Sequence, residues 1–69
     1  MIMTYTLTEP YIELHKLIKL LDLVDTGGQA KMLIENSHVY RNGKIETRKR
    51  AKIIKGEKIT IGDVVIDIV

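Results

Sequence analysis

The sequence predicts an α+β fold in which two short helices pack on a small, largely antiparallel sheet. Three observations support it. The chain opens with an alternating, β-prone segment; a helical apolar period follows from Leu14; and several short β-prone segments separated by turn signals follow residue 38. With 69 residues, the chain is expected to form one domain, 1–69. A chain of this size buries only roughly 60% of its unfolded surface, so its core must be small.

The first strand and the first helix follow from a change in apolar period. Residues 3–8 alternate and are rich in β-formers, and Pro10 follows them, so a strand is predicted there. Apolar side chains then recur at helical spacing, which predicts a helix over about residues 13–23. The residues that would form its buried face are Leu14, Leu17, Ile18 and Leu21.

A second short helix is expected over about residues 28–36. Thr26 is a suitable N-cap, and Gly27 and Gly28 allow a tight turn between the two helices. Asn36 and Ser37 would end this helix. Its inward face would consist of Ala30, Leu33 and Ile34.

The rest of the chain reads as short strands and turns. Asn42-Gly43 between residues 39–41 and 44–45 is a strong hairpin signal, because a type I′ turn needs positive φ at both central residues. Residues 55–58 form a second turn signal before a strand at 59–61. Gly62-Asp63 then joins this strand to a last one at 64–69, and the two should form a hairpin.

The positive charge is concentrated in one segment. Residues 41–58 contain eight Lys or Arg and two acids, Glu46 and Glu57, which gives +6, whereas the segments on either side are each −2. Such a concentration in a small domain favours a polyanionic partner, because each neutralised phosphate releases counterions.

Within this segment, Arg48, Arg50 and Lys52 have the same parity. If the segment is extended, they project from one face, while Lys49 and Ala51 project from the other. Arg can hold a phosphate with two parallel hydrogen bonds. The alternative is a solvated run of charge, but two acids among ten ionisable groups argue against ordinary charge mixing.

Composition excludes several other functions. The chain has no Cys, so it has no disulfide, no zinc thiolate and no thiol nucleophile. His15 and His38 lack partners at ligand spacing, so no metal and no cofactor are expected. No nucleophile–base set is present, which argues against an enzyme. No apolar run reaches the ~20 residues of a membrane span, and the start does not resemble a signal peptide, so a cytoplasmic monomer is expected.

The order and spacing of these pieces resemble a known family. The run from Leu14 to Gly43, LHKLIKLLDLVDTGGQAKMLIENSHVYRNG, is similar to the RNA-binding domain named after ribosomal small-subunit protein four, here the S-four domain. TGGQAK, the later ETRKR and the KGEKI turn look like its small stand-alone bacterial type, the YbcJ-like form. The resemblance covers about residues 12–61.

The resemblance implies a non-enzymatic protein that binds structured RNA, with ribosomal RNA as the first expectation and transfer RNA as the second. The inter-helix turn and the start of the second helix would lie against the RNA backbone, and the hairpin with the basic segment would supply the other contacts. Many family members carry Arg on the second helix, whereas this chain has only Lys31 there. The implied RNA-binding residues are Thr26, Gly27, Gly28, Gln29, Lys31, Lys44, Arg48, Lys49, Arg50 and Lys52.

Recognition should depend mainly on phosphate and shape, because the only aromatic residues are Tyr5, Tyr11 and Tyr40 and a stacking platform needs clustered rings. Two other functions stay open. One is a protein-interaction adaptor whose basic face binds an acidic partner. The other is duplex DNA binding, which the short, weakly basic second helix disfavours.

Overall fold

The computed structural model describes residues 1–69 and has two helices, a five-stranded sheet and a two-stranded ladder. The sheet order is β1-β7-β6-β3-β4, in which β1 runs parallel to β7 and the other pairs are antiparallel. This arrangement confirms the predicted α+β class. The elements are β1 (Ile2–Tyr5), β2 (Ile12–Glu13), α1 (Leu14–Leu20), α2 (Gly27–Glu35), β3 (Val39–Arg41), β4 (Lys44–Ile45), β5 (Lys52–Ile53), β6 (Lys58–Ile61) and β7 (Val64–Ile68).

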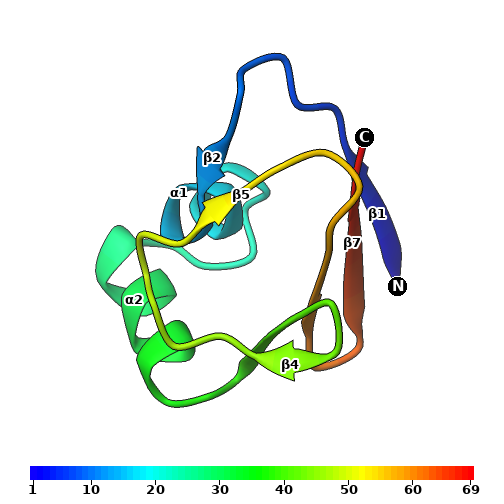
Figure 1. The fold of residues 1–69 in the computed structure, drawn as a ribbon. Helices are drawn as coiled ribbons and strands as arrows, with labels where there is room; N and C mark the ends of the chain where they lie inside the picture. The colour runs from blue at the N-terminus through cyan, green and yellow to red at the C-terminus, as the bar shows by residue number, and fades with distance from the viewer.

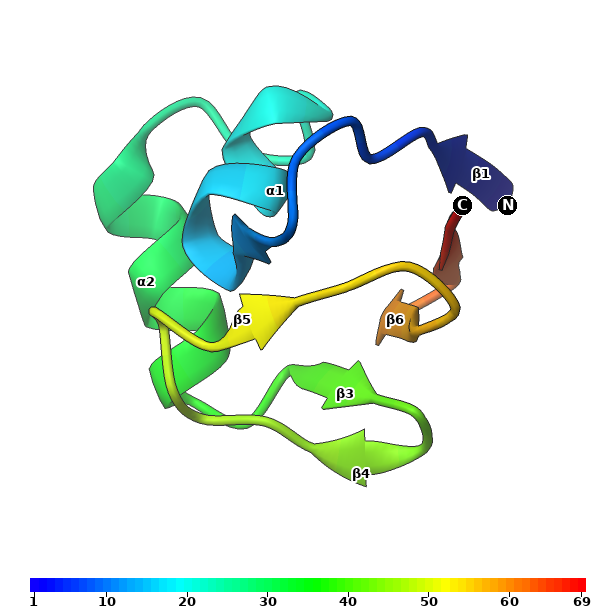
Figure 2. The same ribbon diagram turned by 45° about the horizontal axis from the view of Figure 1, so that its top comes forward.

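The helices and the β2–β5 ladder gather on one side of the molecule, and β1 and β7 lie on the opposite side (Figures 1 and 2). Between them is one apolar core of 12 buried residues. Three core residues of α1 match the predicted stripe, and Leu21 packs against them half-buried. The core draws on both helices, on β3, β5, β6 and β7, and on two loop residues: Leu7, Leu14, Leu17, Ile18, Ala30, Ile34, Val39, Ala51, Ile53, Ile59, Ile66 and Ile68.

Helix α1 is shorter than the predicted helix over 13–23. It ends after Leu20 because Asp22 adopts a left-handed conformation with φ 57°. The Leu23 N–H then donates to the Ile18 carbonyl and the Asp22 N–H to the Lys19 carbonyl, which is a Schellman ending. Helix α2 ends in the same way, with Ser37 at φ 64° in the left-handed position. Helix α2 begins and ends one residue earlier than the predicted helix over 28–36.

The predicted hairpins are present. Asn42 and Gly43 have φ of 52° and 84°, as a type I′ turn requires, and they join β3 to the antiparallel β4. The turn at 55–58 leads into β6, and Gly62-Asp63 joins β6 to β7. The first strand is Ile2–Tyr5 rather than 3–8, although the Leu7 N–H still donates to the Val69 carbonyl at 2.7 Å.

The basic segment is not extended over residues 48–51, so the alternation that would place Arg48, Arg50 and Lys52 on one face does not apply. A turn closes where the Ala51 N–H donates to the Arg48 carbonyl at 3.1 Å. The start of α1 explains this turn, because its first N–H groups have no acceptor within the helix. The Leu14 and His15 N–H groups instead donate to the carbonyls of Ala51 and Lys49, both at 3.0 Å.

Candidate nucleic-acid interface

The basic loop, defined here as residues 46–51 between β4 and β5, runs beside both helices (Figure 1). Its backbone is tied to the start of α1 by the two hydrogen bonds to Lys49 and Ala51. Its Lys49 ammonium lies 3.8 Å from the Glu35 carboxylate at the last residue of α2. The loop is therefore held at three points, and its cations project from a fixed backbone.

The N-terminus of α2 is closed by a capping box. The Thr26 hydroxyl accepts from the Gln29 N–H at 3.2 Å, and the Gln29 side-chain oxygen accepts from the N–H groups of Asp25 at 2.7 Å and Thr26 at 3.2 Å. The predicted N-cap is confirmed. The polar oxygens of Thr26 and Gln29, two of the implied contacts, are thus engaged within the protein.

The capping box does not involve Gly27 and Gly28, the first two residues of this helix. Their N–H groups belong to the first turn and have no hydrogen-bond partner. Neither glycine has a positive φ, and a Cβ at Gly27 would meet no atom within 4 Å. A Cβ at Gly28 would meet only the Thr26 hydroxyl, at 3.8 Å. The fold therefore does not require glycine at either position, and an anion can reach both donors.

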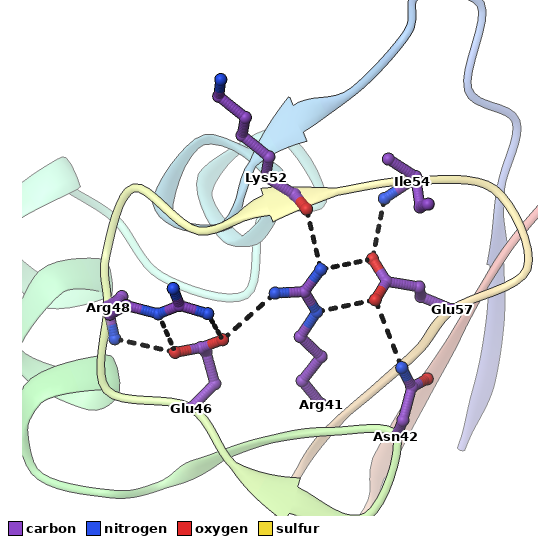
Figure 3. A network of polar contacts seen from close by, with 7 residues as sticks. All are labelled: Arg41, Asn42, Glu46, Arg48, Lys52, Ile54 and Glu57. Atoms are coloured by element: carbon purple, nitrogen blue, oxygen red, sulfur yellow. Dashed lines mark hydrogen bonds and ion pairs between the residues drawn. The ribbon is translucent and has the colours of Figure 1, made fainter.

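A polar network lies between the β3–β4 hairpin and the chain that follows the basic loop (Figure 3). Arg41 donates to both oxygens of Glu57, at 2.7 and 3.0 Å, and to the Lys52 carbonyl at 2.9 Å. A fourth hydrogen bond, at 3.3 Å, reaches Glu46. Glu57 also accepts from the Ile54 N–H at 2.8 Å. Arg41, whose role the sequence left open, thus connects the hairpin with β5 and the turn before β6.

Glu46 is the anchor of the basic loop within this network. It is 7% exposed and accepts from the Arg48 side chain at 3.0 and 3.1 Å and from the Arg48 N–H at 3.1 Å. These hydrogen bonds from Arg48, outweighing burial and helped by Arg41, lower the pKa of Glu46 to about 2. The pKa of Arg41 is raised, chiefly by its hydrogen bonds to Glu57.

This network divides the eight cations of residues 41–58 into two groups. Four of them have carboxylate partners: Arg41, Arg48, Lys49 and, at 3.9 Å from Asp67, Lys58. The four that form no ion pair are Lys44, Arg50, Lys52 and Lys55. The sequence indicated Glu46 and Glu57 only as acids that reduce the net charge of residues 41–58. Their positions beside arginines depend on the fold, so this segment alone does not predict them.

The implied contacts fall into two clusters rather than one. Thr26 to Lys31 occupy the first half of α2, whereas Lys49 meets Glu35 at the other end of this helix. Eight residues of rise at about 1.5 Å each separate the ends by roughly 12 Å. Lys44 and Arg48 line a shallow hollow beside the hairpin. A single small anion cannot touch all of these positions, whereas a long polyanion can.

No group of three or more His, Cys, Asp or Glu side chains is placed to hold a metal ion. Neither helix has the length and apolar character needed to traverse a bilayer. His15 forms a 3.2 Å contact with Glu13.

Comparison with known proteins identifies the family. The family model of the S4 domain, the S-four domain of the sequence analysis, matches residues 5–69. The chain is 41% identical over 51 residues to the "Putative RNA-binding protein YbcJ" of Escherichia coli strain K12, covering 74% of this chain and 73% of that one. The "Uncharacterized protein YbcJ" of Shigella flexneri gives the same values. The solution structure of E. coli YbcJ, described as having an alfaL motif involved in RNA-binding, matches with a TM-score of 0.73 and 36% identity over 96% of this chain and 85% of that one. On this evidence of sequence, structure and site, the chain belongs to the S4 domain family.

Proposed function

We propose that this protein binds structured RNA without catalysing a reaction, with ribosomal RNA as the first candidate and transfer RNA as the second. The observation that carries the proposal is the combination of S4 family membership with cations that have no partner inside the protein. The name of the E. coli relative and the description of its structure both refer to RNA binding.

The contacts in this proposal differ in kind. Lys44, Arg50 and Lys52 supply free charge to phosphates, because no carboxylate neutralises them. Arg48 keeps one amine of its guanidinium free while the rest of the group is held by Glu46. Lys49 can exchange its long 3.8 Å contact with Glu35 for a phosphate. These five side chains position the RNA backbone without reading its bases.

The first turn of α2 supplies the second cluster. The N–H groups of Gly27 and Gly28 point out of the helix start, and Lys31 follows one turn later on the same helix. Thr26 and Gln29 act indirectly, since their capping box fixes the helix start. An RNA that touches both clusters extends along α2, which fits recognition by shape and phosphate.

The test replaces free cations while leaving the internal network intact. Lys44→Ala/Arg50→Ala removes two exposed side chains that form no hydrogen bond or ion pair. Lys19→Ala/Lys55→Ala is the matched control, because it removes the same charge from two exposed, unpaired positions outside the proposed contacts. We expect the first variant to lose affinity for a hairpin RNA and to reduce its log–log salt slope by about 1.4–1.8, at ~0.7–0.9 per contact.

Equal effects of the two double variants would mean that net charge alone attracts RNA and would overturn the proposed surface. Competition separates the remaining functions. A-form hairpin RNA, B-form duplex DNA of the same sequence and polyglutamate should be compared at matched salt. RNA should bind tightest. Preference for polyglutamate would instead indicate an adaptor with an acidic protein partner, and preference for DNA would indicate a DNA-binding protein.

A further inference from the structure

A hollow beside β2 brings together two of the three tyrosines. Tyr5 and Tyr11 line it with Pro10 and Leu20, and its volume is about 440 Å³. This lies in the range of clefts that hold small ligands, roughly 300–1,000 Å³. Tyr11 is 42% exposed and Leu20 is 60% exposed. The tyrosines are six positions apart and separated by a proline, so the sequence did not indicate that they meet.

Tyr11 also touches the basic surface. The Lys52 ammonium lies 5.0 Å from the centre of its ring, within the range of a cation–π contact. β2 pairs with β5, with Glu13 opposite Lys52, and this pairing holds Lys52 close to Tyr11. Lys52 does not line the hollow, so the cation meets the ring from outside it. One aromatic side chain therefore lies between the hollow and a cation that has no carboxylate partner.

The polar groups of the hollow suit a nucleobase better than a phosphate. Three charged side chains line it, Glu9, Glu13 and Lys16. Lys16 lies 3.5 Å from the Glu13 carboxylate, so the unbalanced charge is that of Glu9, which repels phosphate but accepts hydrogen bonds from N–H groups. Adenine, cytosine and guanine carry exocyclic amines with two N–H donors at their edges, whereas uracil offers a single imino N–H. The Glu9 carboxylate forms no hydrogen bond or ion pair within the protein, so it is available as an acceptor.

We propose that this hollow is a subsite for one unpaired, amine-bearing nucleobase, which stacks on Tyr11 while an adjoining phosphate binds Lys52. The proposal rests on the RNA-binding function proposed above and extends it from phosphate contacts to a base contact. Single bases stacked on aromatic side chains are a common mode of RNA recognition. Stacking uses the face of the Tyr11 ring, so the ring rather than the hydroxyl carries this role.

The experiment compares two RNA duplexes that differ by a single bulged adenosine. Tyr11→Ala and Tyr11→Leu should weaken binding of the bulged duplex by about 5- to 150-fold, the range expected for loss of one base–aromatic stack. Binding of the fully paired duplex should change less than about twofold. Tyr11→Phe should bind both like the wild type. Tyr40→Ala is the matched control, because Tyr40 is 40% exposed but does not line the hollow.

Each other outcome contradicts the inference in a distinct way. If Tyr11→Leu weakens both duplexes equally, Tyr11 acts only by holding Lys52, and the base subsite is wrong while RNA binding stands. If a bulged uridine binds as tightly as a bulged adenosine, the preference for an amine-bearing base is wrong. If the wild-type protein binds neither duplex nor the hairpin RNA, the proposed function fails together with the subsite.

Discussion

The carboxylate of Glu46 faces two guanidinium groups from different parts of the chain. Arg48 lies two residues away and Arg41 comes from the preceding strand β3. Glu46 is 7% exposed, and a buried carboxylate is tolerated only when it is paired and hydrogen-bonded. Neutralising Glu46 would therefore release Arg48 and loosen the start of the basic loop.

The lowered pKa of Glu46 makes part of the stability depend on pH. Its pKa is about 2 in the folded protein against an ordinary value of 4.5, so the ionised carboxylate stabilises the fold above pH 4.5, and this contribution is lost as pH falls towards 2. Urea unfolding at about pH 6 should show Glu46→Gln to be less stable by about 1.5–3 kcal/mol, the value of hydrogen bonds to a charged group. A gap between wild type and variant that stays constant down to pH 2 would contradict this assignment.

For single residues, the sequence predicted which residue types matter better than it predicted what each residue contacts. It identified the cations of the basic segment and the turn residues Asn42 and Gly43, because both depend on local composition. It could not assign Arg41, whose partner Glu57 is 16 residues away. Contacts between distant residues depend on how strands pair, and a single sequence does not state that pairing.

Helix α2 is the element in which stability and binding are opposed. Its first two residues are glycines, which are less favourable in a helix than alanine by up to about 1 kcal/mol each. Neither packing nor φ explains them, since added methyl groups would meet at most the Thr26 hydroxyl at 3.8 Å. The close approach of RNA to the backbone that we propose would explain them.

We therefore expect Gly27→Ala/Gly28→Ala to raise the free energy of unfolding and to weaken RNA binding at once. The gain should be about 0.5–1 kcal/mol in urea unfolding, because alanine restricts the unfolded chain and suits the helix. Binding should weaken because the methyl groups cover the two free N–H donors. Gly56, which has φ 91° in the turn before β6, provides the contrast: Gly56→Ala should destabilise the fold. Unchanged RNA affinity in the α2 variant would exclude this helix start from the interface.

Elements with strong local signals were predicted well, and those that depend on tertiary pairing were not. The capped start of α2 and the β3–β4 hairpin follow from a few adjacent residues. The end of α1 was placed three residues late, because a left-handed aspartate carries no clear sequence signal. The β2–β5 ladder was missed, since two-residue strands have no period to detect. Without knowledge of this ladder, the sequence offered no reason to expect a turn in the basic segment.

At the scale of the whole molecule, only part of the formal charge is available to a partner. Residues 41–58 carry eight cations, but four of them face carboxylates. The free cations lie on β4, the basic loop, β5 and the turn after it. A count of charges along the sequence therefore overestimates the number of phosphates that this protein can neutralise.

The salt dependence of RNA binding measures that number. If the contacts are the proposed Lys31, Lys44, Arg48, Lys49, Arg50 and Lys52, the log–log slope should be about −4.2 to −5.4, at ~0.7–0.9 per phosphate. Engagement of all eight cations of residues 41–58 would give about −5.6 to −7.2 on the same scale. Affinities measured by fluorescence anisotropy between about 50 and 200 mM salt distinguish the two, and the steeper slope would show that the internal ion pairs open on binding.

The parallel pairing of β1 with β7 sets the order in which this protein can be completed during translation. Ile2 lies beside Val65 and Tyr5 beside Ile68, so the first strand to be made has no neighbour until the last one has been added. The helices and the β3–β4 hairpin form their contacts within a short stretch of chain. The sheet edge at β1 is thus unfinished until β7 has been made, and its closure must follow the emergence of β7 from the exit tunnel.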